Sequence, residues 1–239
     1  MQLFYNPNVS EADSILNFDK DESRHILRVL RKKSGDIVHI TNGKGWLFIS
    51  ELISVEQKYC SAKIISKQEF KKRNYKLHLA VAPTKINDRF EWFLEKATEI
   101  GVDVITPIIC DHSERKVIKT ERFEKIIQSA MKQSLQYQLP ELKPLTLFKD
   151  FIKQDFTGQR FIAHCEETER KSLKSQIKSR TDITILIGPE GDFSVKEIQT
   201  SLKHNFIPVT LGETRLRTET AAIVACHSVA FINEAHNGQ

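Results

Sequence analysis

Polar and apolar residues alternate along much of the first third of this chain, a pattern that predicts β-strands with one buried face. The glycine-rich segment 42–45 predicts the turn of a hairpin between two of these strands. Apolar residues at helical spacing favour one short helix before them. The helix is predicted at residues 21–30, and the strands are predicted at 36–41, 46–49 and 61–65. We expect residues 1–70 to form a small β-barrel with one packed helix.

From residue 76 onward, continuous apolar runs alternate with amphipathic segments, the order that is typical of a parallel α/β sheet. Pro107 lies inside one of these runs and indicates an edge strand or a bend. The polar segment 71–75 is the predicted linker between a domain at 1–70 and a domain at 76–239. Strands are predicted at 77–82, 104–109, 160–164, 183–187 and 207–211. Helices are predicted at 89–100 and 120–137, in the charged stretch between 165 and 182, after residue 194, and at 219–235.

Local signals set the ends of two of these helices. Asp88 and Glu91 have the spacing of a capping pair at the start of the first helix, and Gly101 stands where a C-terminal cap is expected. Ser194 and Glu197 form a second predicted capping box. The last helix differs from the others because it is apolar on most faces, so its own sheet or another subunit must cover it.

Charge and cysteine content narrow the class of protein. The net charge is +5, and residues 1–75 carry 13 Lys and Arg against 9 Asp and Glu, which suggests a polyanionic partner for the first domain. The four cysteines are widely spaced and the histidines show no metal-binding pattern, so we expect free thiols in a reducing cytoplasm and no metal. No apolar run approaches the roughly 20 residues of a membrane helix, so no membrane association is expected.

The loop after the strand at 183–187 carries the first candidate chemistry. Gly188 and Gly191 allow the backbone to approach a ligand closely. Glu190 and Asp192 would repel a phosphate, so the loop favours a cationic ligand or a nucleoside. A plain strand-to-helix turn is the alternative. Because this loop follows a parallel strand, it lies at the sheet edge where such folds bind ligands.

The loop after the strand at 207–211 forms the second part of the same predicted pocket. It contains Gly212, and Arg215, Arg217, Thr218 and Glu219 follow at the start of the last helix. Arginine at the mouth of a pocket suits phosphate or the polarised oxygens of a base. The alternative is a buried ion pair between arginine and glutamate that orients the helix.

A basic cluster in the first domain is the third candidate site. Arg24, Arg28 and Arg31 share one face at α-helical spacing, and Lys32 follows directly. This arrangement is typical of a patch that contacts phosphates, although a solvated helix face has the same appearance.

Four segments, taken in order, resemble the SPOUT superfamily of methyltransferases, and within it the family that methylates N3 of a uridine in small-subunit (16S) ribosomal RNA. Asp192 stands where that family commonly has a second glycine. Thr214-Arg215 stands where an arginine followed by an aliphatic residue is common. The four segments are 25–31 with Gly35-Asp36, 95–102 with 105–107, 187–191, and 211–212 with 216–221.

The resemblance implies an N-terminal PUA-like RNA-binding barrel and a C-terminal SPOUT domain with a trefoil knot. It also implies a cytoplasmic homodimer that methylates ribosomal RNA of the small subunit with S-adenosylmethionine. Arg217 is then expected to stabilise the uridine anion, and Glu219 or Glu190 to accept its proton. Arg24, Arg28, Arg31 and Lys32 are expected to bind RNA. The cofactor-binding residues it implies are Leu186, Ile187, Gly188, Glu190, Gly191, Leu211, Gly212, Leu216 and Thr218.

Three other functions remain open from the sequence. The motifs do not report the acceptor atom, so methylation of a ribose 2′-oxygen or of guanine is possible within the superfamily. A non-catalytic RNA-binding protein would explain the basic first domain, but it would not explain the two glycine-bearing loops. A metabolic enzyme that binds a nucleotide or cofactor would explain the sheet, but it would not explain the basic patch of the first domain.

Overall fold

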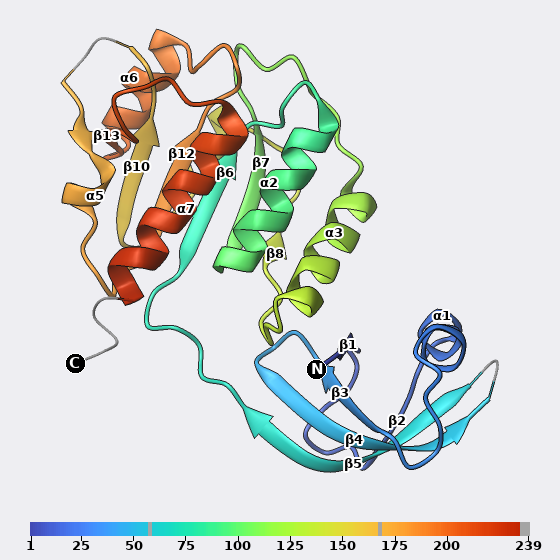
Figure 1. The fold of residues 1–239 in the computed structure, drawn as a ribbon. Helices are drawn as coiled ribbons and strands as arrows, with labels where there is room; N and C mark the ends of the chain where they lie inside the picture. The colour runs from blue at the N-terminus through green and yellow to red at the C-terminus, as the bar shows by residue number, and fades with distance from the viewer. Residues whose placement is uncertain (57–58, 167–168, 235–239) are drawn as a thin grey trace. The chain divides into compact units, whose positions relative to one another are not determined.

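The computed structural model describes residues 1–56, 59–166 and 169–234 (Figure 1). The chain forms two compact units. The first comprises Met1–Lys72 and Met131–Leu139, and the second comprises Arg73–Ala130 and Pro140–Gln239. The division after Lys72 falls inside the segment predicted as a linker. That Met131–Leu139 returns to the first unit was not predicted from the hydrophobic pattern.

The first unit is built on a five-stranded sheet with the order β1-β3-β4-β5-β2. The three predicted strands are present, and β4 and β5 extend well beyond their predicted ends. Two strands of three residues each, β1 and β2, were not predicted. All neighbouring strands are antiparallel except β1 and β3. The strands are β1 (Leu3–Tyr5), β2 (Ile15–Asn17), β3 (Ile37–Thr41), β4 (Trp46–Val55) and β5 (Cys60–Glu69).

The predicted helix of the first unit has two parts. Helix α1 (Lys20–Arg24) begins after Asp19, whose side chain accepts a hydrogen bond from the Glu22 amide at 2.8 Å. The chain then continues as a π-helix, η1 (His25–Val29). Ile26 of η1 is fully buried and packs in a core with Ile40 and Phe48 of the sheet.

The second unit contains an eight-stranded sheet in which every pair of neighbouring strands is parallel. Its order is β11-β13-β10-β12-β6-β7-β8, and β9 also pairs with β7. All five predicted strands are present: β6 (Leu77–Val81), β7 (Val104–Ile109), β10 (Gln159–Ala163), β12 (Ile183–Ile187) and β13 (Ile207–Thr210). Three strands of two residues each were not predicted: β8 (Glu141–Leu142), β9 (Thr146–Leu147) and β11 (Lys171–Ser172).

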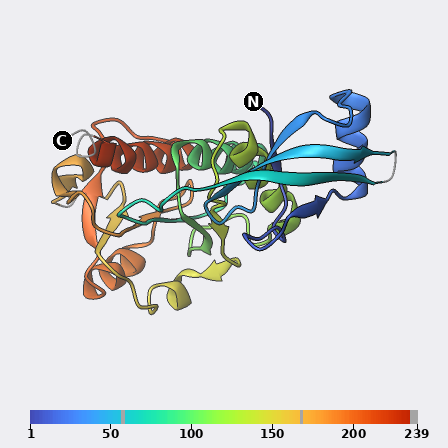
Figure 2. The same ribbon diagram turned by 90° about the horizontal axis from the view of Figure 1, so that it is seen from below.

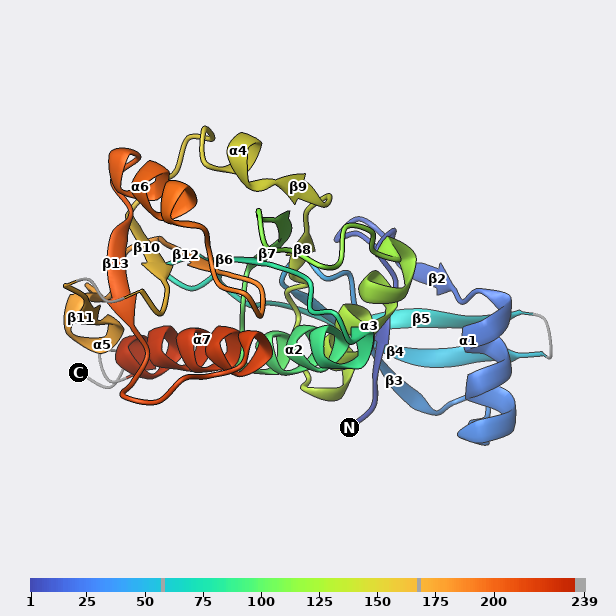
Figure 3. The same cartoon turned by 90° about the horizontal axis from the view of Figure 1, so that it is seen from above.

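Helices cover both faces of this sheet (Figures 2 and 3). Helices α2 (Asn87–Ile100) and α7 (Thr218–Glu234) pack side by side on one face, and α3 (Thr120–Gln133) lies beside α2. Helices α4 (Phe148–Phe151) and α6 (Val195–Lys203) lie on the opposite face, and α5 (Leu173–Gln176) contacts α7. No helix within the described residues is both long and apolar enough to cross a lipid bilayer.

Several predicted helix boundaries are wrong. Helix α2 begins after Ile86, which provides no side-chain cap, and Glu91 accepts a hydrogen bond from Asn87 instead of completing a box with Asp88. Helix α3 ends at Gln133, not at 137. The charged helix expected between 165 and 182 is reduced to the four residues of α5. The predicted end of the last helix, residue 235, lies outside the described residues.

Other boundary signals are confirmed. Gly101 ends α2 in a left-handed conformation with φ 111°, and its amide donates to the Ala97 carbonyl. Ser194 and Glu197 form the predicted capping box of α6. Pro107 does not mark an edge strand, because β7 lies inside the sheet. On one side, β7 pairs with β8 up to Ile105 and with β9 from Ile108 onward. Pro107 lies between these two pairings, so its missing N–H interrupts neither ladder.

Candidate active site

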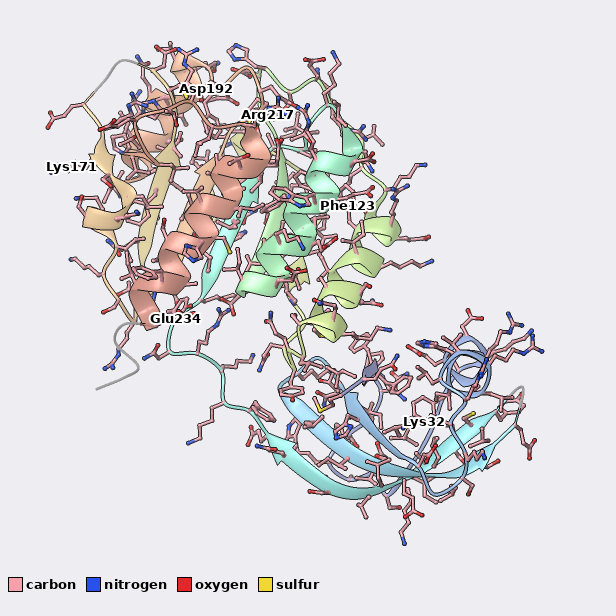
Figure 4. The ribbon with its side chains drawn as sticks, in the orientation of Figure 1. Lys32, Phe123, Lys171, Asp192, Arg217 and Glu234 are labelled. Atoms are coloured by element: carbon pink, nitrogen blue, oxygen red, sulfur yellow. The ribbon has the colours of Figure 1, made fainter. Side chains whose placement is uncertain are left out.

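The two glycine-bearing loops meet at the carboxyl edge of the parallel sheet. The first follows β12 and the second follows β13, and both strands flank β10. The Thr218 hydroxyl, at the start of α7, donates a hydrogen bond of 3.0 Å to the Gly188 carbonyl, so the two segments are in direct contact. Figure 4 shows Asp192 and Arg217 at this end of the unit, whereas Glu234 lies at the far end of α7. The sequence-predicted loops are therefore parts of one region.

The acidic side chains of the first loop hold the loop in place. Glu190 accepts a hydrogen bond of 2.9 Å from the Lys85 amide. Asp192 has a left-handed φ of 63°, and its carboxylate accepts hydrogen bonds from the amides of Cys165 at 2.6 Å and Phe193 at 2.8 Å. These contacts explain the two acidic groups without a ligand. They weaken the sequence-based argument that the acidic groups select a cationic ligand.

The end of the first loop is anchored to its neighbours by Glu197. One carboxylate oxygen accepts from the Ser194 amide at 2.9 Å, and the other accepts from the Asp111 amide at 3.0 Å. The side chain is buried, and this burial raises the pKa of the Glu197 carboxyl. The loop that carries Gly188 and Gly191 is thus held at both ends.

The two loops leave different amounts of room for a ligand. A side chain at Gly188 would meet the Phe193 ring at 3.1 Å, and one at Gly191 would meet His112 at 3.1 Å. Gly212 differs, because a side chain there would meet no atom within 4 Å. The space above the second loop is therefore the place where a ligand can approach the backbone most closely.

A pocket of about 630 Å³ opens beside the second loop. It is formed by the first turns of α2 and α7 and by the segment that precedes α7. Arg217 and Glu219, the two predicted catalytic residues, both line it. The other residues of its lining are Asp88, Arg89, Trp92, Arg215, Leu216 and Thr220. Three arginines and two carboxylates give the pocket its charge, and Trp92, which is 45% exposed, supplies one aromatic surface.

Glu219 is the most deeply buried charged group of this pocket. The residue is 6% exposed, and its Oε2 atom has no hydrogen-bond partner among the described residues. Its Oε1 atom lies 3.8 Å from Nε of Arg89. The sequence allowed an ion pair between an arginine and Glu219 as an alternative to a catalytic role. Such a pair is present, but its arginine is Arg89 of α2.

Arg115 explains how α2 brings Arg89 and Trp92 to the pocket. Its guanidinium donates to the carbonyls of Thr84 at 3.0 Å and Lys85 at 2.9 Å, and to the Asn87 side chain at 3.1 Å. These bonds fix the segment that enters α2. Sequence reasoning did not identify Arg89 or Trp92 as lining residues, because neither belongs to a glycine-bearing loop.

The basic residues predicted to bind RNA in the first unit do not form the regular face that was expected. Arg24 lies in the last turn of α1 and Arg28 lies in the π-helix, whose wider turn breaks the α-helical spacing. Arg31 lies beyond the helix with a left-handed φ of 52°. Lys32 donates to the Ile37 carbonyl at 3.3 Å. The three arginines are exposed, and the four residues remain close along the chain without a common helical face.

The described residues contain no group of three or more His, Cys, Asp or Glu side chains that could hold a metal ion. Three of the four cysteines are buried and Cys165 is exposed, and all four are free thiols.

Comparison with known proteins identifies the class. Residues 71–230 match the family model of an RNA methyltransferase domain, and residues 18–65 match that of an RNA methyltransferase PUA domain. Both units thus have the features of one class of RNA-modifying protein.

The chain belongs to the ribosomal RNA small subunit methyltransferase E family. The member from Buchnera aphidicola (strain APS) is 36% identical over 233 residues, which cover 90% of this chain and 88% of that protein. A crystal structure from Porphyromonas gingivalis is 39% identical with a TM-score of 0.92, and the match covers 99% of this chain and 100% of that one. The Neisseria gonorrhoeae family member, solved bound to S-adenosyl methionine, is 26% identical with a TM-score of 0.85, covering 97% and 98%.

Proposed function

We propose that this protein transfers a methyl group from S-adenosylmethionine to N3 of a uridine in the 16S ribosomal RNA of the small subunit. The observation that carries the proposal is the junction of the two loops at Thr218 and Gly188, directly beside a pocket that contains Arg217 and Glu219. Membership of the family supports the same activity and makes a non-catalytic RNA-binding role the weaker alternative.

The residues at the carboxyl edge fit the nucleoside part of S-adenosylmethionine. Gly212 leaves its backbone open to a ligand, and buried apolar side chains such as Leu186 and Ile187 lie just before the first loop. Glu190 and Thr218 shape the site through their bonds to Lys85 and Gly188. The full set proposed to hold the cofactor is Leu186, Ile187, Gly188, Glu190, Gly191, Leu211, Gly212, Leu216 and Thr218.

When bound, S-adenosylmethionine supplies an electrophilic methyl group, and the remaining chemistry belongs to the pocket. Uridine N3 carries a proton and becomes a good nucleophile only when that proton leaves. The buried, unpartnered Oε2 atom of Glu219 is suited to accept it. Arg217 lines the same pocket and stabilises the negative charge that develops on the uracil oxygens. Arg89 orients the Glu219 carboxylate from 3.8 Å.

Trp92 gives the pocket a surface on which an unstacked base can rest. Enzymes that modify a base must take it out of the helical stack, and aromatic side chains commonly receive it. Trp92 is the aromatic residue among those that line the pocket. In the first unit, the exposed Arg24, Arg28 and Arg31, together with Lys32, contact the RNA backbone and position it without reading sequence.

The proposal includes a homodimer, a trefoil knot and a cytoplasmic location. Helix α7 buries Ala222, Ala225 and Val229 against its own unit, yet Phe231 remains 62% exposed. An apolar helix with such an exposed side chain supports a subunit interface along α7 and α2. A knot at the carboxyl edge is consistent with β12 and β13 flanking the earlier strand β10. The proposed substrate in the small ribosomal subunit supports a cytoplasmic location.

The test combines nucleoside analysis with one matched pair of variants. The protein is incubated with small ribosomal subunits and S-adenosylmethionine, and the digested RNA is analysed by mass spectrometry. We expect N3-methyluridine. Arg217→Ala should slow turnover about 10²–10³-fold while calorimetry shows nearly unchanged cofactor binding. The control that also removes one positive charge is Lys203→Ala, at the last residue of α6, which should leave both properties unchanged.

Each result has a clear meaning. A methylated guanine or ribose in place of N3-methyluridine would contradict the acceptor that we propose. A wild-type protein that binds no S-adenosylmethionine would contradict the methyltransferase activity as a whole. Unchanged turnover in Arg217→Ala would remove Arg217 from the catalytic residues.

A further inference from the structure

His164 lies between the two loops of the active site. It follows the last residue of β10, Ala163, which is paired with Ile187 of β12 on one side and Val209 of β13 on the other. The two glycine-bearing loops continue from those two neighbouring strands. His164 therefore occupies the middle of the carboxyl edge, although it belongs to neither loop and to no motif.

The His164 imidazole is buried and makes no hydrogen bond to the described residues. The residue is 4% exposed, and neither Nδ1 nor Nε2 has a partner among the described residues. Leaving a buried polar group unpaired destabilises the fold, so such a group calls for a specific explanation. A leucine of similar size would avoid that cost at this position.

The charged neighbours of the ring do not complete its hydrogen bonding. Asp192 is near enough to interact with it electrostatically, but the Asp192 carboxylate already accepts from the amides of Cys165 and Phe193. Arg170 donates to the backbone carbonyl of His164, not to its ring. Burial lowers the pKa of the His164 imidazole, Arg170 lowers it further, and Asp192 and Glu166 act in the opposite direction. The ring is therefore neutral near pH 7, with one nitrogen that donates and one that accepts.

We propose that His164 binds the adenosine part of S-adenosylmethionine through its ring nitrogens. This inference rests on the proposed function. A neutral imidazole complements groups that both donate and accept, and the ribose hydroxyls and the adenine edge of the cofactor are such groups. The carboxylate of the methionine part would be matched better by a cation, and the sulfonium offers no hydrogen bond. His164 is thus a binding residue whose hydrogen bonds form only when the cofactor is present.

The experiment uses His164→Leu, which removes both nitrogens at similar volume, and His164→Gln, which restores one donor and one acceptor. Calorimetry measures the binding of S-adenosylhomocysteine and of 5′-methylthioadenosine, which lacks the amino acid part. We expect His164→Leu to weaken both ligands by the same factor, up to about tenfold, and His164→Gln to recover part of the loss. His204→Leu, after the far end of α6, is the matched control and should bind like the wild type.

Thermal unfolding of the ligand-free protein separates binding from a structural role. Because the ring has no hydrogen-bond partner in the part of the chain that the structure describes, His164→Leu should melt at or above the wild-type temperature without ligand and should gain less from added S-adenosylhomocysteine. A lower melting temperature without ligand would overturn the proposal, as would unchanged affinity or a loss confined to S-adenosylhomocysteine. If the wild type binds neither ligand, the proposed function fails as well. If the wild type binds both ligands and His164→Leu binds them with the same affinity, only this inference fails.

Discussion

Acidification should destabilise the second unit through a single partly buried histidine. His78 lies on β6, where its Nε2 atom is 2.8 Å from the Thr106 hydroxyl and its ring packs against Phe151 at a centroid distance of 5.4 Å. The pKa of His78 falls from 6.5 to about 4, chiefly because of burial; Lys76 and Lys143 add to the lowering, and Glu141 opposes it. The perturbation is therefore a drop in pH that protonates this residue in the unfolded chain but not in the folded one.

The size of the effect follows from the two pKa values. Above pH 6.5 both states hold a neutral ring, and His78 adds no pH dependence. Between pH 6.5 and 4 the unfolded state binds the extra proton, so the stability of the fold is lost as the pH falls. With a folded pKa of about 4, this loss amounts to about 2 kcal/mol at pH 5 and approaches about 3 kcal/mol below pH 4.

The assay compares thermal unfolding of the wild type and His78→Gln at pH 7.5 and pH 5. The amide of Gln does not titrate in this range and can still bond to Thr106. A loss of about 2 kcal/mol corresponds to roughly 4–8 °C for a unit of this size, and the wild type should show that much more acid sensitivity than the variant. His227→Gln, at an exposed position on α7, should behave like the wild type. If acidification lowers the melting temperatures of the wild type and His78→Gln by the same amount, burial does not lower the pKa of His78 as we expect.

Three further predictions concern the site and the backbone. Glu219→Gln should slow methyl transfer about 10²–10⁴-fold with unchanged S-adenosylhomocysteine affinity, and single-turnover rates equal to the wild type would contradict its role as base. Gly158→Ala should lower the melting temperature far more than Gly35→Ala. The new Cβ at position 158 would lie 1.9 Å from the Asp182 carbonyl oxygen, whereas one at position 35 would meet no atom within 4 Å. Equal shifts in melting temperature would contradict this prediction. Asp192→Ala should be less stable than Asp192→Gly, since both lose the carboxylate but only glycine relieves the left-handed φ of 63°; the reverse order in thermal unfolding would refute the argument.

The parallel sheet was predictable from the sequence because its central strands are buried on both faces. Continuous apolar runs mark β6, β7 and β12, and the helices between the strands carry the amphipathic spacing that completes an α/β pattern. The missed strands of both sheets, such as β8 and β11, have two or three residues, too few to show a period. Helix α3 stops before its predicted end, and Leu135 two residues later has a left-handed φ of 55°, which local spacing does not reveal.

The site was predictable only where it coincides with a loop after a strand. Gly188 and Gly212 mark those loops, and the parallel topology brings them to one edge. Trp92 and Arg89 reach the pocket from a helix far earlier in the chain, through a segment that Arg115 fixes by contacts with Thr84, Lys85 and Asn87. No local pattern encodes a contact of that range, so these residues emerge from the structure alone.

The identity of the partner of Glu219 decides how the pocket can work. The sequence allowed an ion pair between arginine and glutamate within the start of α7, which would have used Arg217 to orient the helix. In the structure the Glu219 carboxylate faces Arg89, and Arg217 has no acidic partner within 4 Å among the described residues. A guanidinium that is not neutralised by the protein is available to a negative charge brought by the substrate. The division of labour that we propose follows from this arrangement: Arg89 orients the base, and Arg217 stabilises the anion that the base creates.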